Sequence, residues 1–194
     1  MINLAYDYQD ERPTEMLDGV IYMMASPRLV HIRVGRNIED IFKKYFRGKS
    51  CDVFGDPAKV FLTENDRVVP DVTVVCDENI IKDEGIFGVP DLIVEILSPS
   101  TSKRDKTYKK SLYEKCGVKE YWIVDIDNLS IEVFWLTDGK YLLHDVFTIL
   151  PEYEKQDMTI EKISEFTTRF KTSIAGGLVI DLEEVFEDVI ERSK

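Results

Sequence analysis

The sequence lacks any run of apolar residues long enough to cross a membrane. The longest runs span a handful of residues, as in Val20 to Ala25, whereas a membrane helix needs about 20. The first residues also lack the basic region and apolar block of a secretory signal. These absences predict a cytoplasmic protein that does not bind a membrane.

Cysteine and histidine are scarce as well. The three cysteines, Cys51, Cys76 and Cys116, are widely spaced and form no Cys-x-x-Cys pair, and the chain has only 2 histidines. This pattern indicates neither a disulfide framework nor a zinc site. We therefore expect all three cysteines to be small, buried, reduced side chains.

No segment is rich in glycine, serine or proline, and no sequence period repeats. What is present is enough apolar material for a core, since 44% of the 194 residues are apolar and 11% are aromatic. We predict a single domain over residues 1–194, with an N-terminal hairpin near 14–26 and an acidic, helical C-terminal extension near 151–194. The net charge of -12 argues against a protein that coats nucleic acid.

The hydrophobic periodicity predicts an α/β fold, a mixed sheet flanked by helices. An Asp18-Gly19 turn indicates the hairpin. Helices are expected from Val34 to Gly48, from Ser102 to Cys116 behind a Ser102/Asp105 capping box, and in the tail over 181–190. Strands are expected at 51–54, 58–62, 68–75, 90–97, 121–126, 131–136 and 141–147.

Carboxylates interrupt two strands that otherwise look fully buried. Asp71 lies in the first, and Asp91 and Glu95 lie in the second. Isolated buried carboxylates cost several kcal/mol, so they must be paired, protonated or bound to a cation. Asp91 and Glu95 share a strand face, and Asp71 could join them if the strands are adjacent, which would suit Mg²⁺ or Mn²⁺. Alternatively, Asp71 and Asp91 cap strand starts after their prolines and Glu95 pairs with an arginine.

Several motifs in order resemble the PD-(D/E)XK nuclease superfamily and, more closely, the Uma-two family of restriction-endonuclease-like proteins. The similarity covers roughly residues 14 to 136, and the opening Glu15-Met-Leu-Asp-Gly and His31 also fit it. The other matching segments are Val69-Pro-Asp-Val-Thr-Val-Val, Gly88-Val-Pro-Asp-Leu-Ile-Val-Glu-Ile-Leu-Ser-Pro-Ser-Thr, Arg104-Asp-Lys-Thr-Tyr-Lys and Tyr113-Glu-Lys-Cys-Gly-Val-Lys-Glu-Tyr-Trp-Ile-Val-Asp.

The resemblance implies a restriction-endonuclease-like core and Mg²⁺-dependent (or Mn²⁺-dependent) phosphodiester hydrolysis. Asp71 and Glu95 match the two metal-binding acids. The position two residues after Glu95, where the superfamily has its lysine, is Leu97. The family match for that catalytic lysine is Lys109 on the following helix, where it would position or activate the attacking water and add positive charge. Lys106, less than one turn away, is the alternative.

Four further residues are supporting candidates. Asp105 lies four residues before Lys109, on the same helix face, and can orient its amine. Asp91 is either a further metal ligand or a structural cap. The family pattern suggests that Glu15 reaches the site, and His31 is a weaker candidate for a substrate or catalytic role.

Two expected helices are strongly basic despite the overall negative charge. Each of the segments 28–49 and 103–119 has seven basic residues against two acids. Such runs are usually solvated helix faces, but here they could supply phosphate contacts beside the carboxylates. Nucleic acid, DNA above all, is therefore the expected substrate.

Two other interpretations stay open. The chain could keep the nuclease fold as an inactive nucleic-acid-binding or regulatory protein, or it could be a two-carboxylate hydrolase such as a glycosidase, which needs no dication. A homodimer is a further expectation, with the apolar strands 131–136 and 141–147 as an interface.

Overall fold

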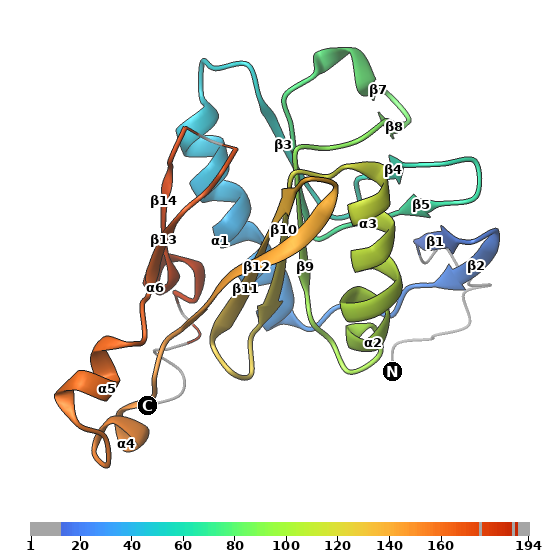
Figure 1. Cartoon of the computed structure of the whole chain (residues 1–194). Coiled ribbons are helices and arrows are strands. Elements are labelled where there is room, and N and C mark those ends of the chain that lie inside the picture. The colour runs from blue at the N-terminus through green and yellow to red at the C-terminus, as the bar shows by residue number, and fades with distance from the viewer. Residues whose placement is uncertain (1–12, 175, 188, 190–194) are drawn as a thin grey trace, which may run out of the picture.

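A six-stranded mixed sheet forms the centre of the computed structural model, which describes residues 13–174, 176–187 and 189 (Figure 1). Its strand order is β12-β11-β10-β9-β6-β3, and only the β9–β10 pair is parallel. The strands are β3 (Asp52–Gly55), β6 (Val72–Val75), β9 (Leu92–Ile96), β10 (Glu120–Asp125), β11 (Ser130–Thr137) and β12 (Lys140–Thr148). The predicted α/β class is confirmed.

Burial explains why the central strands are nearly continuous apolar runs. Every residue of β6 and β9 is buried, because helices cover the sheet on both faces. Such strands do not show the alternation of a half-exposed sheet. Glu95 is the one charged residue within these two strands.

Helix α1 (Leu29–Phe46) covers one face of the central sheet. Its buried residues Val34, Ile38, Phe42 and Phe46 follow the helical repeat, and the Phe42 ring lies 5.5 Å from the Trp122 ring on β10. The helix begins at Leu29, earlier than the predicted Val34. His31 is consequently part of the helix and takes its direction from the helix axis.

The opposite face is covered by the helical segment from Ser102 to Cys116 (Figure 1). It consists of α2 (Ser102–Arg104), the π-helical turn η2 (Asp105–Lys109) and α3 (Lys110–Cys116). The helix begins after Thr101, without a side-chain cap, so the predicted Ser102/Asp105 capping box is wrong. Asp105 instead points into the protein interior, where it is 1% exposed.

A second six-stranded sheet, of order β2-β1-β5-β4-β8-β7, lies beside the first. Its strands are β1 (Thr14–Leu17), β2 (Val20–Met23), β4 (Val60–Phe61), β5 (Arg67–Val68), β7 (Ile81–Lys82) and β8 (Gly85–Phe87), and the short helix η1 (Glu78–Ile80) precedes β7. Positive φ at Asp18 and Gly19 confirms the turn between β1 and β2.

The strand predicted over 68–75 is divided between the two sheets. β5 ends at Val68 and β6 begins at Val72. Pro70 lacks the N–H that an interior strand position would donate, which favours a break there. The break places Asp71 just outside the sheet, at the first residue before β6.

The C-terminal region contains strands as well as helices. Its elements are α4 (Glu152–Lys155), α5 (Ile160–Ser164), β13 (Arg169–Lys171), β14 (Val179–Asp181) and α6 (Leu182–Val185). The expected tail helix over 181–190 is helical only in α6, and Ile190 lies outside the described residues. The prediction of a purely helical extension missed the β13–β14 hairpin, whose strands are only three residues long.

The expectation that all cysteines are reduced is wrong for one pair, because Cys51 and Cys76 form a disulfide. The two residues directly flank the register pair Asp52↔Val75 of β3 and β6, so antiparallel pairing brings them together. Their sequence separation of 25 gave no sign of this. Cys116 is free.

No helix within the part of the chain that the structure describes is long and apolar enough to span a membrane.

Candidate active site

Asp71 and Glu95 lie opposite each other where β6 and β9 meet. The two strands are antiparallel, with Val72 paired to Val94. One step further along this register, Asp71 stands across from Glu95. Directly opposed residues of antiparallel strands project to the same face, and both carboxylates line the same cleft.

Asp71 is held at both of its oxygens. The Nε2 atom of His31 lies 2.7 Å from Oδ1, and the backbone N–H of Ile96 donates to Oδ2 at 2.7 Å. Burial alone would lower the pKa of His31, but the hydrogen bond and negative charge of Asp71 outweigh it and raise that pKa. His31 therefore contacts a candidate metal ligand directly.

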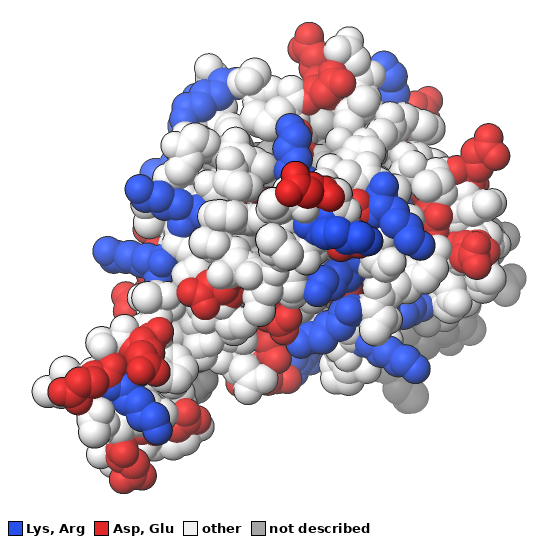
Figure 2. Space-filling model, in the orientation of Figure 1, with Lys and Arg blue, Asp and Glu red and all other residues white. Residues whose placement is uncertain are grey.

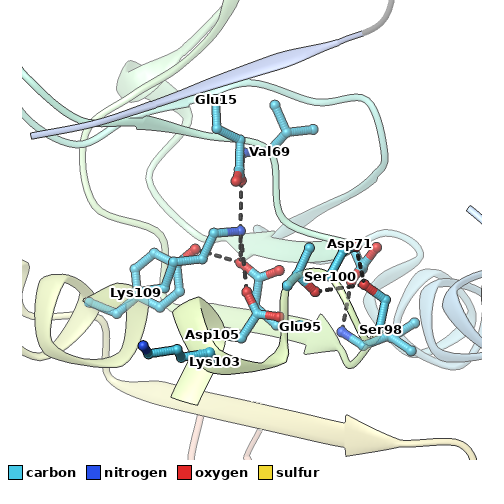
Figure 3. Close-up of polar contacts among 12 residues, drawn as sticks. Glu15, Val69, Asp71, Glu95, Ser98, Ser100, Lys103, Asp105 and Lys109 are labelled. Atoms are coloured by element: carbon cyan, nitrogen blue, oxygen red, sulfur yellow. Dashed lines mark hydrogen bonds and ion pairs between the residues drawn. The ribbon is translucent and has the colours of Figure 1, made fainter. Parts of the chain in front are cut away.

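Lys109 is buried among three carboxylates (Figure 3). Its Nζ atom lies 2.6 Å from Glu15 Oε1, 3.0 Å from Glu95 Oε1 and 3.7 Å from Asp105 Oδ1. Tyr113 also donates its hydroxyl hydrogen to Glu95 Oε1, at 2.6 Å. The structure thus brings Lys109, the family match for the catalytic lysine, into contact with Glu95.

The charges of this cluster determine the protonation of Lys109. Burial would lower the pKa of the lysine, but the carboxylates of Glu95, Glu15 and Asp105 outweigh it and raise the pKa above its usual range. Lys109 is therefore an ammonium ion that donates hydrogen bonds. Burial also raises the pKa of Glu95, although the charge of Lys109 opposes that shift.

Glu15 enters the site from the β1–β2 hairpin. Its Oε1 atom accepts the backbone N–H of Val69 at 3.0 Å as well as contacting Lys109. The hairpin is fastened by Asp66, which accepts hydrogen bonds from the backbone N–H of Asp18 and from the hydroxyl of Tyr108. Since Tyr108 precedes Lys109, one carboxylate ties the hairpin to the helix beside the site.

Asp105 has fewer hydrogen-bond partners than the other three acids of the site, Glu15, Asp71 and Glu95. It is 1% exposed, and neither of its side-chain oxygens has a hydrogen-bond partner. Its closest cation is Lys109 Nζ, at 3.7 Å. Burial raises the pKa of Asp105, and Lys109 opposes the shift. The four-residue spacing thus places Asp105 beside Lys109, where its charge favours the ammonium ion.

These residues lie at a cleft of about 1070 Å³. It is lined by Glu15, His31, Asp71, Glu95 and Lys109, which come from five separate segments of the chain. Such a concave site with converging polar groups is typical of an active site.

The Uma2 family model, described as "Putative restriction endonuclease", matches residues 3–163. The chain belongs to this family. The Uma2 assignment accounts for the order of the motifs from Glu15 to Lys109, and the family's description implies a hydrolase that acts on nucleic acid.

Two relatives and one solved structure are similar to this Uma2 chain. "Uncharacterized protein slr1290" of Synechocystis sp. is 27% identical over 143 residues, covering 72% of this chain and 75% of the relative. "Uncharacterized protein sll1609" of the same organism is 25% identical, covering 81% and 92%. A crystal structure of a "putative nuclease belonging to DUF820" from Anabaena variabilis superposes with a TM-score of 0.64 at 18% identity, covering 92% of each chain. That similarity shows the fold.

Asp91 lies apart from the other candidates. Its Oδ2 atom accepts the backbone N–H of Cys76 at 2.8 Å, and its Oδ1 atom lies 2.6 Å from Nζ of Lys119. It does not line the cleft. Of the two roles open for Asp91, the structure shows the contacts of a structural cap.

Asp56 lines the cleft but was not identified from the sequence. Partial burial is the main cause that raises the pKa of Asp56, and the nearby Asp71 carboxylate raises it further. It stands in a Gly-Asp-Pro loop, which indicates a turn and gives no direction for the side chain. Only the packing of that loop against the start of β6, where the Asp56 N–H donates to the carbonyl of Asp71, brings it to the site.

The residues present fit a hard divalent cation in their chemistry. Within the described ranges no group of three or more His, Cys, Asp or Glu side chains is already arranged around a common point. Mg²⁺, however, is commonly held by one or two carboxylates, completed by water and phosphate oxygens. Asp71 and Glu95 could be those two ligands, and the surplus of buried carboxylates over cations around Lys109 would favour added positive charge.

The surface charge is uneven. In Figure 2, Lys and Arg side chains gather among acids over the face where α2 and α3 lie, whereas the α4–α5 projection carries many acids. Several basic residues of the two predicted basic helices are already paired, as Lys106 is with Glu132 and Lys43 with Glu39. The local positive charge available to a phosphate is thus smaller than the count along the sequence suggested.

Proposed function

We propose that this Uma2 protein is a Mg²⁺-dependent endonuclease that hydrolyses phosphodiester bonds in DNA. The observation that supports this most is the register that sets Asp71 opposite Glu95 at the cleft, with Lys109 bonded to Glu95. Two converging carboxylates and a nearby ammonium group are the donor set that metal-assisted phosphodiester hydrolysis requires.

The protein's own groups would orient the reaction. When bound by Asp71 and Glu95, Mg²⁺ supplies positive charge for the phosphate and lowers the pKa of a water. Lys109 donates to Glu95 Oε1 and fixes the direction of that carboxylate. His31 and the N–H of Ile96 fix Asp71 in the same way. Lys109 would position or activate the attacking water and add positive charge beside the phosphate.

A plasmid cleavage assay tests the proposal. Supercoiled DNA is incubated with the wild-type protein in Mg²⁺ or Mn²⁺, with and without a chelator, beside Asp71→Asn and Glu95→Gln. Glu132→Gln is the matched control, because this carboxylate pairs with Lys106 on the surface. We expect wild type and the control to cut only with the dication, and both cleft variants to lose cleavage.

Other results would contradict the mechanism. Cleavage that survives chelation would point to a metal-free hydrolase, and cleavage that survives both cleft substitutions would remove these carboxylates from the chemistry. DNA binding without cleavage by the wild type in either metal would favour an inactive, nucleic-acid-binding member of the fold.

We also propose that the chain forms a homodimer through β12. This strand is an edge of the central sheet, and its Leu142, Leu143 and Val146 are 57%, 52% and 44% exposed. β11 is paired on both sides and is not available at an edge. Light scattering of wild type and Leu143→Lys tests this, and a monomeric wild type would contradict it.

A further inference from the structure

Tyr22 lies on the cleft side of the β1–β2 hairpin, next to the candidate catalytic groups. In the hairpin register Tyr22 is directly paired with Glu15, so the two side chains project from the same face. Glu15 extends to Lys109, and Tyr22 lines the cleft while remaining 37% exposed. A partly exposed aromatic ring thus lies next to Glu15, which belongs to the buried cluster around Lys109.

Arg104 covers this tyrosine from the helix. Its guanidinium carbon lies 4.7 Å from the centre of the Tyr22 ring, and Arg104 also lines the cleft. The π-helical turn η2 begins directly after Arg104 and ends at Lys109. Residues five apart are aligned in a π-helical turn, so Arg104 and Lys109 face the same side. Within the described residues no carboxylate forms an ion pair with Arg104.

Hydroxyl groups continue the same wall of the cleft. Ser98, Ser100 and Thr101 follow β9 and line the cleft beside Arg104, and Ser98 and Ser100 lie near Asp71 (Figure 3). The Ser98 hydroxyl oxygen is 3.1 Å from that of Ser100 and 3.0 Å from that of Thr101. An aromatic face, a guanidinium and hydroxyl donors are the groups that bind a base and its phosphate together.

We propose that Tyr22 and Arg104 form a subsite for an unpaired nucleotide beside the bond that is cut, so that the substrate is a strand unpaired at that point, as in single-stranded DNA or a locally opened stretch of a supercoiled plasmid. This rests on the proposed nuclease function and adds the strandedness of the substrate. Because Arg104 lies over one face of the Tyr22 ring, the base stacks on the other face, and Arg104 and the hydroxyl groups contact the adjacent phosphate. In a duplex both faces of a base are covered by its neighbours, so a paired strand cannot use this ring without local opening.

The size of the cleft agrees with this substrate. At about 1070 Å³ it is close to the upper end of sites that enclose small ligands, roughly 300–1,000 Å³. Such a space suits a short stretch of one strand. Because stacking depends on the π-face that every base has, we expect little dependence on base sequence.

Binding without turnover tests the inference. Fluorescence anisotropy compares a labelled single-stranded oligonucleotide of roughly 12 nucleotides, within the usual site sizes for such proteins, with its duplex. Ca²⁺ replaces Mg²⁺, and the proteins are wild type, Tyr22→Ala, Tyr22→Phe and Ile21→Ala. Ile21 is the matched control, because it neighbours Tyr22, points to the other face of the hairpin and is 66% exposed.

We expect tighter binding of the single strand than of the duplex. Tyr22→Ala should weaken single-strand binding roughly fivefold to a hundredfold, the range that loss of one base–aromatic stack gives. Tyr22→Phe keeps the ring and should bind nearly as wild type, and Ile21→Ala should be unchanged. A 2-aminopurine base in the oligonucleotide should be quenched by wild type and Tyr22→Phe and not by Tyr22→Ala.

The outcomes separate this inference from the nuclease proposal. Equal affinity for duplex and single strand, or wild-type binding by Tyr22→Ala, would overturn the subsite even if the plasmid is cut. Tyr22-dependent binding of the single strand in a protein that cuts nothing would support the subsite and contradict the nuclease activity. Absence of any oligonucleotide binding by wild type would overturn the subsite as well.

Discussion

Pro70-Asp71 and Pro90-Asp91 each precede a fully buried strand of the central sheet, yet their carboxylates have different surroundings. Asp71 faces the cleft opposite Glu95, whereas Asp91 binds the N–H of Cys76 and the ammonium of Lys119. The difference follows from strand direction. β6 and β9 are antiparallel, so their first residues lie at opposite ends of the paired strands. We call the side of the sheet at these two strand ends the Asp71 edge and the Asp91 edge. The same local motif serves a site at the Asp71 edge and a strand cap at the Asp91 edge.

The largest effect should come from removing the cation at the Asp71 edge. Lys109→Met leaves Glu15, Glu95 and Asp105 buried without their shared partner, which should lower the free energy of unfolding by about 3–5 kcal/mol. Urea denaturation measures it.

Lys106→Met is the control for that experiment, because Lys106 belongs to the same helical turn but pairs with Glu132 at the surface, with 44% of its side chain exposed. Its loss should cost about 1 kcal/mol or less. Similar effects for the two lysines would mean that the Asp71 edge is not electrostatically distinct.

The next effect concerns activity at the two edges. Asp71→Asn should reduce the rate of metal-dependent cleavage about a hundredfold to a thousandfold, the loss typical of one group that stabilises transition-state charge. Asp91→Asn should leave the rate within a few fold of wild type, since Asp91 is outside the cleft. Initial rates on plasmid DNA measure both, and a comparable loss in Asp91→Asn would break the distinction between the edges.

A smaller effect is expected on stability at the Asp91 edge. Asp91→Ala removes the acceptor of the Cys76 N–H and should lower the free energy of unfolding by about 1–3 kcal/mol. Lys119→Ala, which removes an amine that is 68% exposed, should cost less than about 1 kcal/mol. If the lysine substitution proves the more costly, the ion pair and not the cap holds this edge.

The smallest effect is a dependence on pH at the Asp71 edge. Because the folded-state pKa of His31 is raised, its pairing with Asp71 stabilises the protein fully below the unfolded pKa. That stabilisation disappears as the pH rises through the folded-state pKa. The stability difference between wild type and His31→Asn should therefore shrink from about 1 kcal/mol towards zero with rising pH. Denaturation curves at several pH values measure it, and a difference that grows with pH would contradict the pairing.

Much of the fold was predictable because it depends on local patterns. The buried runs of β6 and β9, the Asp18-Gly19 turn and the apolar stripe of α1 all follow from spacing along the chain. Elements of two to four residues, such as β4, β5 and β13, were not predicted with their observed bounds. Such short segments are too short to show a hydrophobic period.

The candidate site was predictable in its residue types and less so in its contacts. The motifs identified Asp71, Glu95 and Lys109, but the partners of Lys109 depend on where the hairpin lies. Glu15 reaches it only because β1 pairs with β5 and Asp66 fastens the turn. Asp56 and Tyr22 had no distinguishing pattern at all.

The sequence by itself determined which segments are buried, which helix faces are apolar and, through its motifs, membership of the Uma2 family. Only the tertiary structure decided that Asp71 and not Asp91 meets Glu95, that Cys51 bonds Cys76, and that Tyr22 stands beside Glu15. The physical reason is that burial follows from the local spacing of apolar residues. Contacts between distant residues follow from strand order, direction and register, which are set by the packing of the whole chain.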